Sequence, residues 1–263
     1  MKQRVLTGII AGAAFIALTV LGGYPFAILV CLMAIIGLKE LLAMKKKSIF
    51  SLSGLISVLI LLVLVIPNDY FSQLDLHLNV FNIVVIGTLA LLIITVLSKN
   101  EYTFEDAAVS LLTILYVGYG FHAFLDVRLN ENGLPMLFFI LFMIWATDSG
   151  AYFVGKSLGK TKLWPAISPN KTIEGSLGGV FAAVIVAVVF QMIQPLFDSM
   201  AYVLVIAIIV GVSGQLGDLI QSAFKRYYGV KDSGTLLPGH GGILDRFDST
   251  IFVFSLLYVL QLI

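Results

Sequence analysis

The sequence predicts an all-α integral membrane protein, a single domain (residues 1–263) built as a bundle of about nine transmembrane helices with a cytoplasmic N-terminus. The mean hydropathy is +1.03, and 59% of the residues are hydrophobic while 12% are charged. Apolar runs of about 20 residues, the length that crosses a bilayer core of ~30 Å, recur along the chain. The basic residues gather in alternate connections between these runs, as they do in membrane proteins.

The candidate spans follow one another with mostly short connections. The first could be mistaken for a secretory signal, because Lys2 and Arg4 precede its apolar stretch. A second apolar run follows at once with no polar domain between them, so we interpret the first run as a retained helix. The expected spans are roughly 4–21, 25–44, 49–66, 80–97, 106–126, 134–155, 173–194, 199–224 and 247–263.

The distribution of positive charge predicts the orientation of these spans. With a cytoplasmic N-terminus and alternating spans, all of the 16 lysine and arginine residues except Arg128 fall at or near the cytoplasmic side. This positive-inside bias supports an odd number of spans. It also places two polar loops, 156–172 and 225–246, on the cytoplasmic side, where a nucleotide would be found.

The two halves of the chain differ in polarity. Residues 1–130 are mainly aliphatic, and we interpret their helices as a scaffold. Residues 134–263 carry most of the polar content, and we expect these helices and their cytoplasmic loops to hold the catalytic groups. The single cysteine, Cys31, lies in an apolar run, which excludes a disulfide framework and a cysteine-based metal site.

Asp148 lies inside an otherwise apolar run, near the end of the sixth span. An ionised carboxylate is costly in a membrane unless it is paired or solvated, so a functional role is the first hypothesis. An ion pair with a nearby lysine is the alternative. Gly150, Gly155 and Gly159 follow and would let backbone or ligand approach closely. We assign Asp148 to the substrate site without choosing between metal, base and sugar as its partner.

The loop before the seventh span, residues 168–172, is a candidate anion site. Asn170 or Thr172 can cap the start of the helix. A helix N-terminus with a lysine beside it binds anions. We therefore expect Lys171 to contact phosphate, with Ser168 and Asn170 as further substrate-binding residues.

Glycines at helical spacing indicate close helix packing. Gly175 and Gly179 form a GxxxG pair in the seventh span, and we interpret them as packing residues. Gly211 and Gly217 occur in the eighth span and would let a neighbouring helix approach.

The end of the eighth span carries a polar face. Gly214, Asp218, Ser222 and Lys225 are spaced by four, four and three residues, so they share one side of a helix. Asp218 could hold a cation near the membrane surface while Lys225 and the adjacent Arg226 bind phosphate. An ion pair between Asp218 and these basic residues is the alternative.

The most informative segment is residues 222–248, SAFKRYYGVKDSGTLLPGHGGILDRFD, which lies between two apolar runs. Its cations, carboxylates and glycines suit a polyphosphate bound by basic side chains and backbone N–H groups, with carboxylates holding Mg²⁺. Asp245 and Asp248 can point the same way, although Asp248 could instead only cap the last helix. His240 is a lone histidine, and zinc-protease, Walker A and GxGxxG patterns are absent from the sequence, which argues against zinc.

This segment resembles the signature of the phosphatidate cytidylyltransferases, the CDP-diacylglycerol synthases. The surroundings of Asp148 and residues 168–175 are also similar to that family, whereas the first half of the chain is similar only in being apolar and multispan. The signature residues are Ser222, Lys225-Arg226, Lys231-Asp232, Pro238, His240-Gly241-Gly242, Asp245-Arg246 and Asp248.

The resemblance implies that the CMP moiety of CTP is transferred to phosphatidate, giving CDP-diacylglycerol and pyrophosphate. It also implies Mg²⁺, in a centre described for the family as holding two metal ions, and a homodimer. The catalytic residues would be Asp218, Asp245, Lys225, Arg226 and His240, and the metal-holding carboxylates Asp218, Asp245 and Asp248. The substrate-binding residues would be Lys171, Ser168, Asn170, Ser222, Lys231, Asp232, Gly241, Gly242, Arg246 and Asp148.

Two other functions stay open at this point. One is a related CTP-dependent membrane enzyme with another lipid acceptor. The other is a secondary transporter that uses Asp148 and Asp218 as an ion relay, although transporters tend to have repeated halves and no such repeat is found here. We expect CTP, phosphatidate and membrane lipid as partners, and no nucleic acid. The expected location is the bacterial cytoplasmic membrane, with the active site on the cytoplasmic side.

Overall fold

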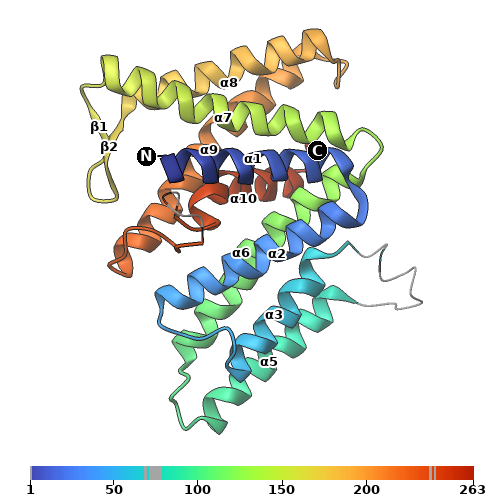
Figure 1. Cartoon of the computed structure of the whole chain (residues 1–263), viewed down its shortest axis with the longest axis vertical. Coiled ribbons are helices and arrows are strands. Elements are labelled where there is room, and N and C mark those ends of the chain that lie inside the picture. The colour runs from blue at the N-terminus through green and yellow to red at the C-terminus, as the bar shows by residue number, and fades with distance from the viewer. Residues whose placement is uncertain (1, 68–69, 71–78, 237–238, 240) are drawn as a thin grey trace. The chain divides into compact units, whose positions relative to one another are not determined.

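The computed structural model describes the chain apart from residues 1, 68–69, 71–78, 237–238 and 240. The described part is built almost entirely from α-helices, which confirms the all-α class (Figure 1). A short antiparallel hairpin of two strands is an addition that the sequence did not indicate. The elements are α1 (Lys2–Leu21), α2 (Gly23–Met44), α3 (Leu52–Val65), α5 (Val80–Leu97), α6 (Phe104–Leu129), α7 (Gly133–Leu158), β1 (Lys162–Trp164), β2 (Ser168–Thr172), α8 (Ile173–Ile193), α9 (Met200–Tyr227) and α10 (Leu244–Val259).

Six of the described helices are long and apolar enough to cross a membrane: α2, α5, α6, α7, α8 and α9. The apolar part of α1, Thr7–Leu21, and the whole of α3 are shorter than a typical span, and α10 has 16 residues. The helices therefore support an integral membrane protein. The number of nine spans and the cytoplasmic N-terminus stay predictions.

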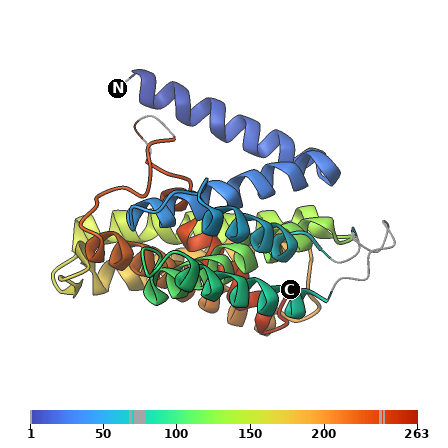
Figure 2. The ribbon, with the colours of Figure 1, turned by 90° about the horizontal axis from the view of Figure 1, so that it is seen from below.

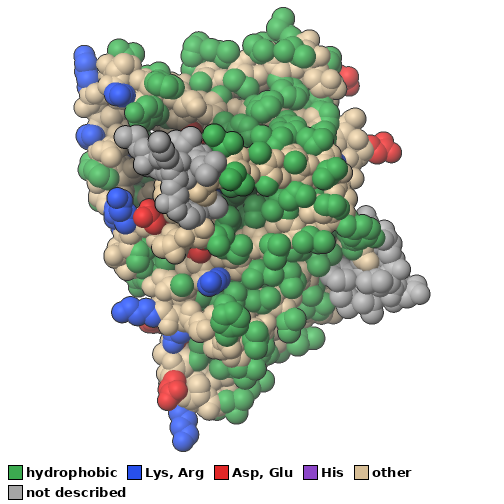
Figure 3. Space-filling model, in the orientation of Figure 1, with side chains coloured by type: hydrophobic (Ala, Val, Ile, Leu, Met, Phe, Trp, Pro, Cys, Tyr) green, Lys and Arg blue, Asp and Glu red, His purple; other side chains and the backbone are tan. Residues whose placement is uncertain are grey.

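The outward-facing side chains of these helices are largely hydrophobic, as the green surface in Figure 3 shows. On α5, Phe81 and Ile86 are 74% and 65% exposed, and on α8 Leu177 and Phe181 are 67% and 66% exposed. Large apolar side chains exposed in such numbers are unusual for a water-soluble monomer and suit contact with lipid.

The chain divides into two compact units. Unit 1 comprises residues 1–126 and 232–245, and unit 2 comprises residues 127–231 and 246–263. The signature segment, residues 222–248, therefore contributes to both units, since its central part belongs to unit 1 and its two ends belong to unit 2.

Unit 1 is held together by aromatic and aliphatic side chains. Phe26 of α2 and Phe124 of α6 are buried, with ring centroids 5.5 Å apart. Helices α3 and α5 run side by side in Figure 1 and, seen from below, in Figure 2. Gly87 allows this approach, because a Cβ there would overlap the side chain of Ile60.

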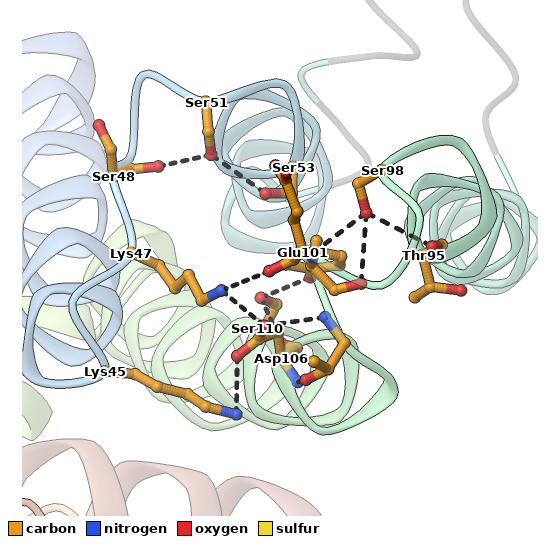
Figure 4. Close-up of polar contacts among 12 residues, drawn as sticks. Lys45, Lys47, Ser48, Ser51, Ser53, Thr95, Ser98, Glu101, Asp106 and Ser110 are labelled. Atoms are coloured by element: carbon orange, nitrogen blue, oxygen red, sulfur yellow. Dashed lines mark hydrogen bonds and ion pairs between the residues drawn. The ribbon is translucent and has the colours of Figure 1, made fainter.

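Asp106, near the start of α6, forms a buried ion-pair cluster in unit 1 (Figure 4). Its side chain is 4% exposed, and its Oδ1 and Oδ2 lie 2.8 and 2.6 Å from the Nζ atoms of Lys45 and Lys47. The backbone N–H of Thr103 donates to Oδ2 at 2.9 Å. The cluster joins the segment after α2 to the start of α6.

We expect Asp106→Asn to destabilise the protein, because the substitution leaves two lysines near a neutral amide. The cost should be about 2 kcal/mol, below the 3–5 kcal/mol typical of fully buried pairs, since both ammonium groups keep contact with solvent. Thermal unfolding of the detergent-solubilised protein measures this as a lower Tm. Glu105→Gln is the matched control, because Glu105 is the exposed neighbour on the same helix turn; an equal Tm for both variants would contradict the role of the cluster.

In unit 2, glycines bring α7 and α8 into close contact. A Cβ at Gly175 would lie 2.8 Å from Ala151 O and 3.0 Å from Gly155 Cα, and one at Gly179 would lie 2.8 Å from Thr147 O. The interpretation of the GxxxG pair as packing is thus confirmed.

Helix α9 is packed through glycines in the same way. Gly211 faces Val180 of α8, with its Cβ position 3.0 Å from Val180 Cα. Gly217 faces α10, where the corresponding distance to Ser249 Cα is also 3.0 Å. These contacts fix the polar end of α9 against two neighbouring helices.

Candidate functional site

The centre of the candidate site in unit 2 is an ion pair between Lys171 and Asp218. Lys171 Nζ lies 2.7 Å from Asp218 Oδ2, and the two side chains are 24% and 37% exposed. Lys171 is placed by strand β2, one residue before Thr172, whose Oγ1 accepts the N–H of Gly175 at 3.1 Å and so caps α8. The expected cap at Thr172 is confirmed.

The hairpin that carries Lys171 is held by polar contacts to α8 and α9. The carboxylate of Glu174, in the first turn of α8, accepts the backbone N–H groups of Lys160 and Thr161, each at 3.1 Å. Gln215 of α9 donates its Nε2 to Ser176 O of α8 at 3.2 Å, which holds the two helices beside the hairpin together. Arg226 Nε donates to Ile167 O, between the two strands, at 3.3 Å. The position of Lys171 therefore depends on several side chains that do not themselves carry the ion pair.

Further polar groups surround Asp218. Ser222, one turn along α9, donates its hydroxyl to Asp218 Oδ1 at 3.2 Å. Asp148 of α7 and Asp248 of α10 both interact electrostatically with Asp218. Lys225 acts on Asp248 as a nearby positive charge. Carboxyl groups from three helices and the lysines Lys171 and Lys225 thus act on one another around Asp218.

The interpretation of Asp248 as only a helix cap is wrong. Helix α10 begins at Leu244, so Asp248 lies inside the helix. Its Oδ1 accepts the N–H of the next residue, Ser249, at 2.7 Å. The helix begins earlier than expected because residues 243–244 already find partners for their N–H groups in unit 1, as described below.

The donor chemistry of this cluster fits Mg²⁺. The ligands offered by Asp148, Asp218, Ser222 and Asp248 are all oxygen atoms, which hard divalent cations prefer. Among the described residues no three His, Cys, Asp or Glu side chains form a ready-made metal cage. Mg²⁺ commonly uses one or two carboxylates, with waters and substrate phosphates completing its shell, so a preformed cage of protein ligands is not required.

The central part of the signature forms a second polar cluster, within unit 1. Asp245 Oδ2 accepts three hydrogen bonds: from Ser233 N at 2.7 Å, Ser233 Oγ at 2.9 Å and Gly242 N at 3.0 Å. Gly241 has a φ of +83°, and a Cβ there would lie 2.6 Å from Asp245 Oδ2. The paired glycines therefore allow the backbone to fold tightly around a carboxylate.

Glu40 of α2 completes this cluster, and the sequence analysis missed it. The residue is 5% exposed, and its carboxylate accepts hydrogen bonds from Ser233, Ile243 and Leu244. The signal that could have found it was present, since Glu40 is a carboxylate within an apolar run, as Asp148 is. The interpretation of residues 1–130 as a scaffold therefore leaves out one carboxylate of this cluster.

The structure thus brings the expected residues together in two groups. Asp148, Lys171, Asp218, Ser222, Lys225 and Asp248 gather in unit 2, and Gly241, Gly242 and Asp245 gather in unit 1. Ser168 and Asn170 lie on β2 beside Lys171. Lys231, Asp232 and Arg246 are exposed. His240 and Pro238 lie outside the described residues.

The apolar helices and these charged groups define the class: an α-helical membrane protein with clustered carboxylates and basic side chains. A model of the family described as "Cytidylyltransferase family" matches residues 2–263. The chain therefore belongs to this family, the resemblance found in the sequence is confirmed, and the protein is a nucleotidyltransferase enzyme.

Curated relatives agree with this assignment. The phosphatidate cytidylyltransferase of Bacillus subtilis (strain 168) is 49% identical over 262 residues, which cover 99% of this chain and 97% of the relative. The protein of the same name from Staphylococcus epidermidis (strain ATCC 12228 / FDA PCI 1200) is 45% identical over 264 residues, and the one from Staphylococcus aureus (strain COL) is 43% identical over 260 residues. Both alignments cover 99% of this chain and 98% of the relative.

Proposed function

We propose that the protein transfers the CMP moiety of CTP to phosphatidate, giving CDP-diacylglycerol and pyrophosphate in phospholipid biosynthesis. The observation that carries the proposal is the Lys171–Asp218 pair, with Ser222, Asp148 and Asp248 around it, in a chain whose relatives are named phosphatidate cytidylyltransferases. Such a cluster of cations and carboxylates suits a reaction between two anionic reactants.

The proposed chemistry is a substitution at phosphorus. An oxygen of the phosphatidate phosphate attacks the α-phosphorus of CTP and forms a new P–O bond. The P–O bond between the α-phosphorus and the bridging oxygen breaks, and pyrophosphate leaves with that electron pair. A phosphate monoester is largely ionised near neutral pH, so the attack needs no dedicated general base. The work of the protein is then mainly positioning and neutralisation of charge.

The residues of the site take the following proposed roles. Lys171, Lys225, Arg226, Lys231 and Arg246 bind phosphate oxygens, and His240 binds phosphate or protonates the leaving pyrophosphate. Asp218, Asp245 and Asp248 hold Mg²⁺, as one ion or a pair, which when bound would neutralise charge on the phosphates. The remaining proposed substrate contacts are Asp148, Ser168, Asn170, Ser222, Asp232, Gly241 and Gly242.

The setting of the reaction is also a proposal. We place the protein in the bacterial cytoplasmic membrane as a homodimer, with the site on the cytoplasmic side. Phosphatidate would reach it from the inner leaflet, its acyl chains staying in lipid while its headgroup meets the charged helix ends. The exposed apolar surfaces of the helices suit that route.

The direct test uses the purified protein in detergent with short-chain phosphatidate, Mg²⁺ and CTP labelled with ³²P at the α-phosphate. We expect label to move into the lipid phase only when both phosphatidate and Mg²⁺ are present. Transfer to another lipid phosphate, with none to phosphatidate, would contradict the assignment of phosphatidate as the acceptor. Absence of transfer to all lipids tested, with folded protein, would contradict the reaction itself.

Lys171→Ala should raise the KM for CTP by roughly 10–100-fold, because the substitution removes a charge-assisted contact to phosphate and leaves Asp218 without its cation. Steady-state rates over a range of CTP concentrations measure this. Lys162→Ala is the matched control, because Lys162 is an exposed lysine on the other strand of the same hairpin. An equal KM for CTP in the two variants would show that Lys171 has only a structural role.

A further inference from the structure

Glu40 is an unusual residue for the place it occupies. It lies in α2, whose sequence is otherwise mostly apolar, and it is 5% exposed. A buried carboxylate is tolerated when its oxygens accept several hydrogen bonds. The identity of its donors therefore indicates what the residue does.

All the donors that the structure gives to Glu40 come from the far end of the chain. Oε1 accepts Ile243 N at 2.9 Å, and Oε2 accepts Leu244 N at 2.9 Å. Leu244 is the first residue of α10, so these N–H groups belong to a helix start that has no acceptors of its own. Glu40 thus caps α10 from another helix, and its negative charge suits the positive end of the helix dipole.

A third bond links Glu40 to Asp245. Ser233 Oγ lies 2.9 Å from Glu40 Oε2 and 2.9 Å from Asp245 Oδ2. Two further contacts, from Ser233 N and Gly242 N, hold the same Asp245 oxygen. The single hydroxyl proton of Ser233 can be donated to either carboxylate, so this residue links the two, and Ser233 and residues 243–244 are held at the two ends of the segment.

The glycines of the segment are explained by the same arrangement. A Cβ at Gly234 would lie 2.6 Å from Glu40 Oε1. A Cβ at Gly242 would overlap the Glu40 carboxylate and Ser233 Oγ. The backbone approaches Glu40 so closely on two sides that side chains are excluded.

We infer that Glu40 is a positioning residue for the reaction: it docks Ser233 and residues 243–244 onto α2 and thereby fixes the direction of the Asp245 carboxylate. The inference rests on the proposed function, in which Asp245 holds Mg²⁺. Glu40 itself touches neither substrate nor metal. A residue that holds a metal ligand in place without touching the metal orients that ligand and changes the affinity of the site for the metal.

The experiment compares Glu40→Ala and Glu40→Gln with the full-length wild type in detergent. Hydrogen exchange is followed at residues 233–245, where loss of the Glu40 acceptors should speed exchange of the Ile243 and Leu244 amides by at least about tenfold in Glu40→Ala. Glu40→Gln keeps one carbonyl acceptor and should give an intermediate rate. This readout does not depend on catalysis.

The kinetic arm measures kcat and the Mg²⁺ concentration for half-maximal activity. We expect Glu40→Ala either to lower kcat by roughly 10–100-fold or to raise the Mg²⁺ concentration for half-maximal activity by the same factor. Glu40→Gln should give an intermediate change. Glu105→Gln is the matched control, since it alters an exposed carboxylate of unit 1, on helix α6. Its exchange at residues 233–245 and its kcat per folded molecule should equal those of the wild type.

The outcomes separate cleanly. Unchanged exchange in Glu40→Ala would overturn the docking role. Faster exchange with wild-type kcat and Mg²⁺ dependence would overturn the positioning role and leave a structural cap. If Glu40→Ala does not fold, Glu40→Gln decides by the same two measurements. If the wild type transfers no CMP, the proposed function fails, while the exchange rates still decide whether Glu40 docks the segment.

Discussion

Asp218→Asn should lower CMP transfer by at least about 10²–10³-fold, the usual cost of removing one preorganised electrostatic group from an active site. The substitution preserves shape, and Asn can still accept the hydroxyl of Ser222. It removes the charge that pairs with Lys171 at 2.7 Å and that would bind a cation. The label-transfer assay with lipid extraction measures the loss, with Tm measured in parallel to show that the variant is folded.

The control for this variant is Asp198→Asn, an exposed carboxylate of unit 2 between α8 and α9. Its activity should match the wild type. Near-normal transfer by Asp218→Asn would show that the Asp218 carboxylate has no role in the reaction. A double variant with Lys171→Ala adds a further measurement: because the two residues are in contact, their effects should be clearly non-additive.

Gly242→Ala should lower CMP transfer by roughly 10–100-fold, because its Cβ would displace the groups that orient Asp245. The Glu40 carboxylate could swing away from the new methyl group, but only by breaking hydrogen bonds to Ser233, Ile243 or Leu244. The cost therefore comes from lost hydrogen bonds rather than from the clash alone. The measurement is kcat at saturating CTP and phosphatidate, with the Mg²⁺ dependence recorded at the same time.

Gly12→Ala is the matched control for Gly242→Ala, because a Cβ at Gly12 meets no atom within 4 Å. Ala is also the better helix former at that position in α1. Wild-type activity in Gly242→Ala would show that the close approach of the backbone to Glu40 has no bearing on the site.

Features that depend on neighbours in sequence were predictable. The start of α8 followed from Thr172 and the residues after it, and the packing glycines followed from their helical spacing. The polar face of α9 was also evident, because four-residue spacing places Asp218 and Ser222 together on any helix. In each case the physical cause lies within one or two turns of the chain.

Features that depend on distant partners were not predictable. Lys171 was expected to contact phosphate, but its pairing with Asp218 joins residues from β2 and α9 that no local pattern connects. The hairpin was missed because its strands are short and one contains Pro169, which favours neither strand nor helix. The start of α10 was placed too late because its first N–H groups are satisfied by Glu40, some 200 residues earlier in the chain.

The cap on α10 has a consequence for biosynthesis. When α2 enters the membrane, the residues that will donate to Glu40, which are 193 to 204 positions later in the chain, have not yet been translated. Glu40 is four residues from the end of α2, so its carboxylate can stay hydrated at the interface while the ribosome continues. Helix α2 therefore stays without these polar contacts until residues 233–244 have been translated and Ser233, Ile243 and Leu244 can donate to Glu40.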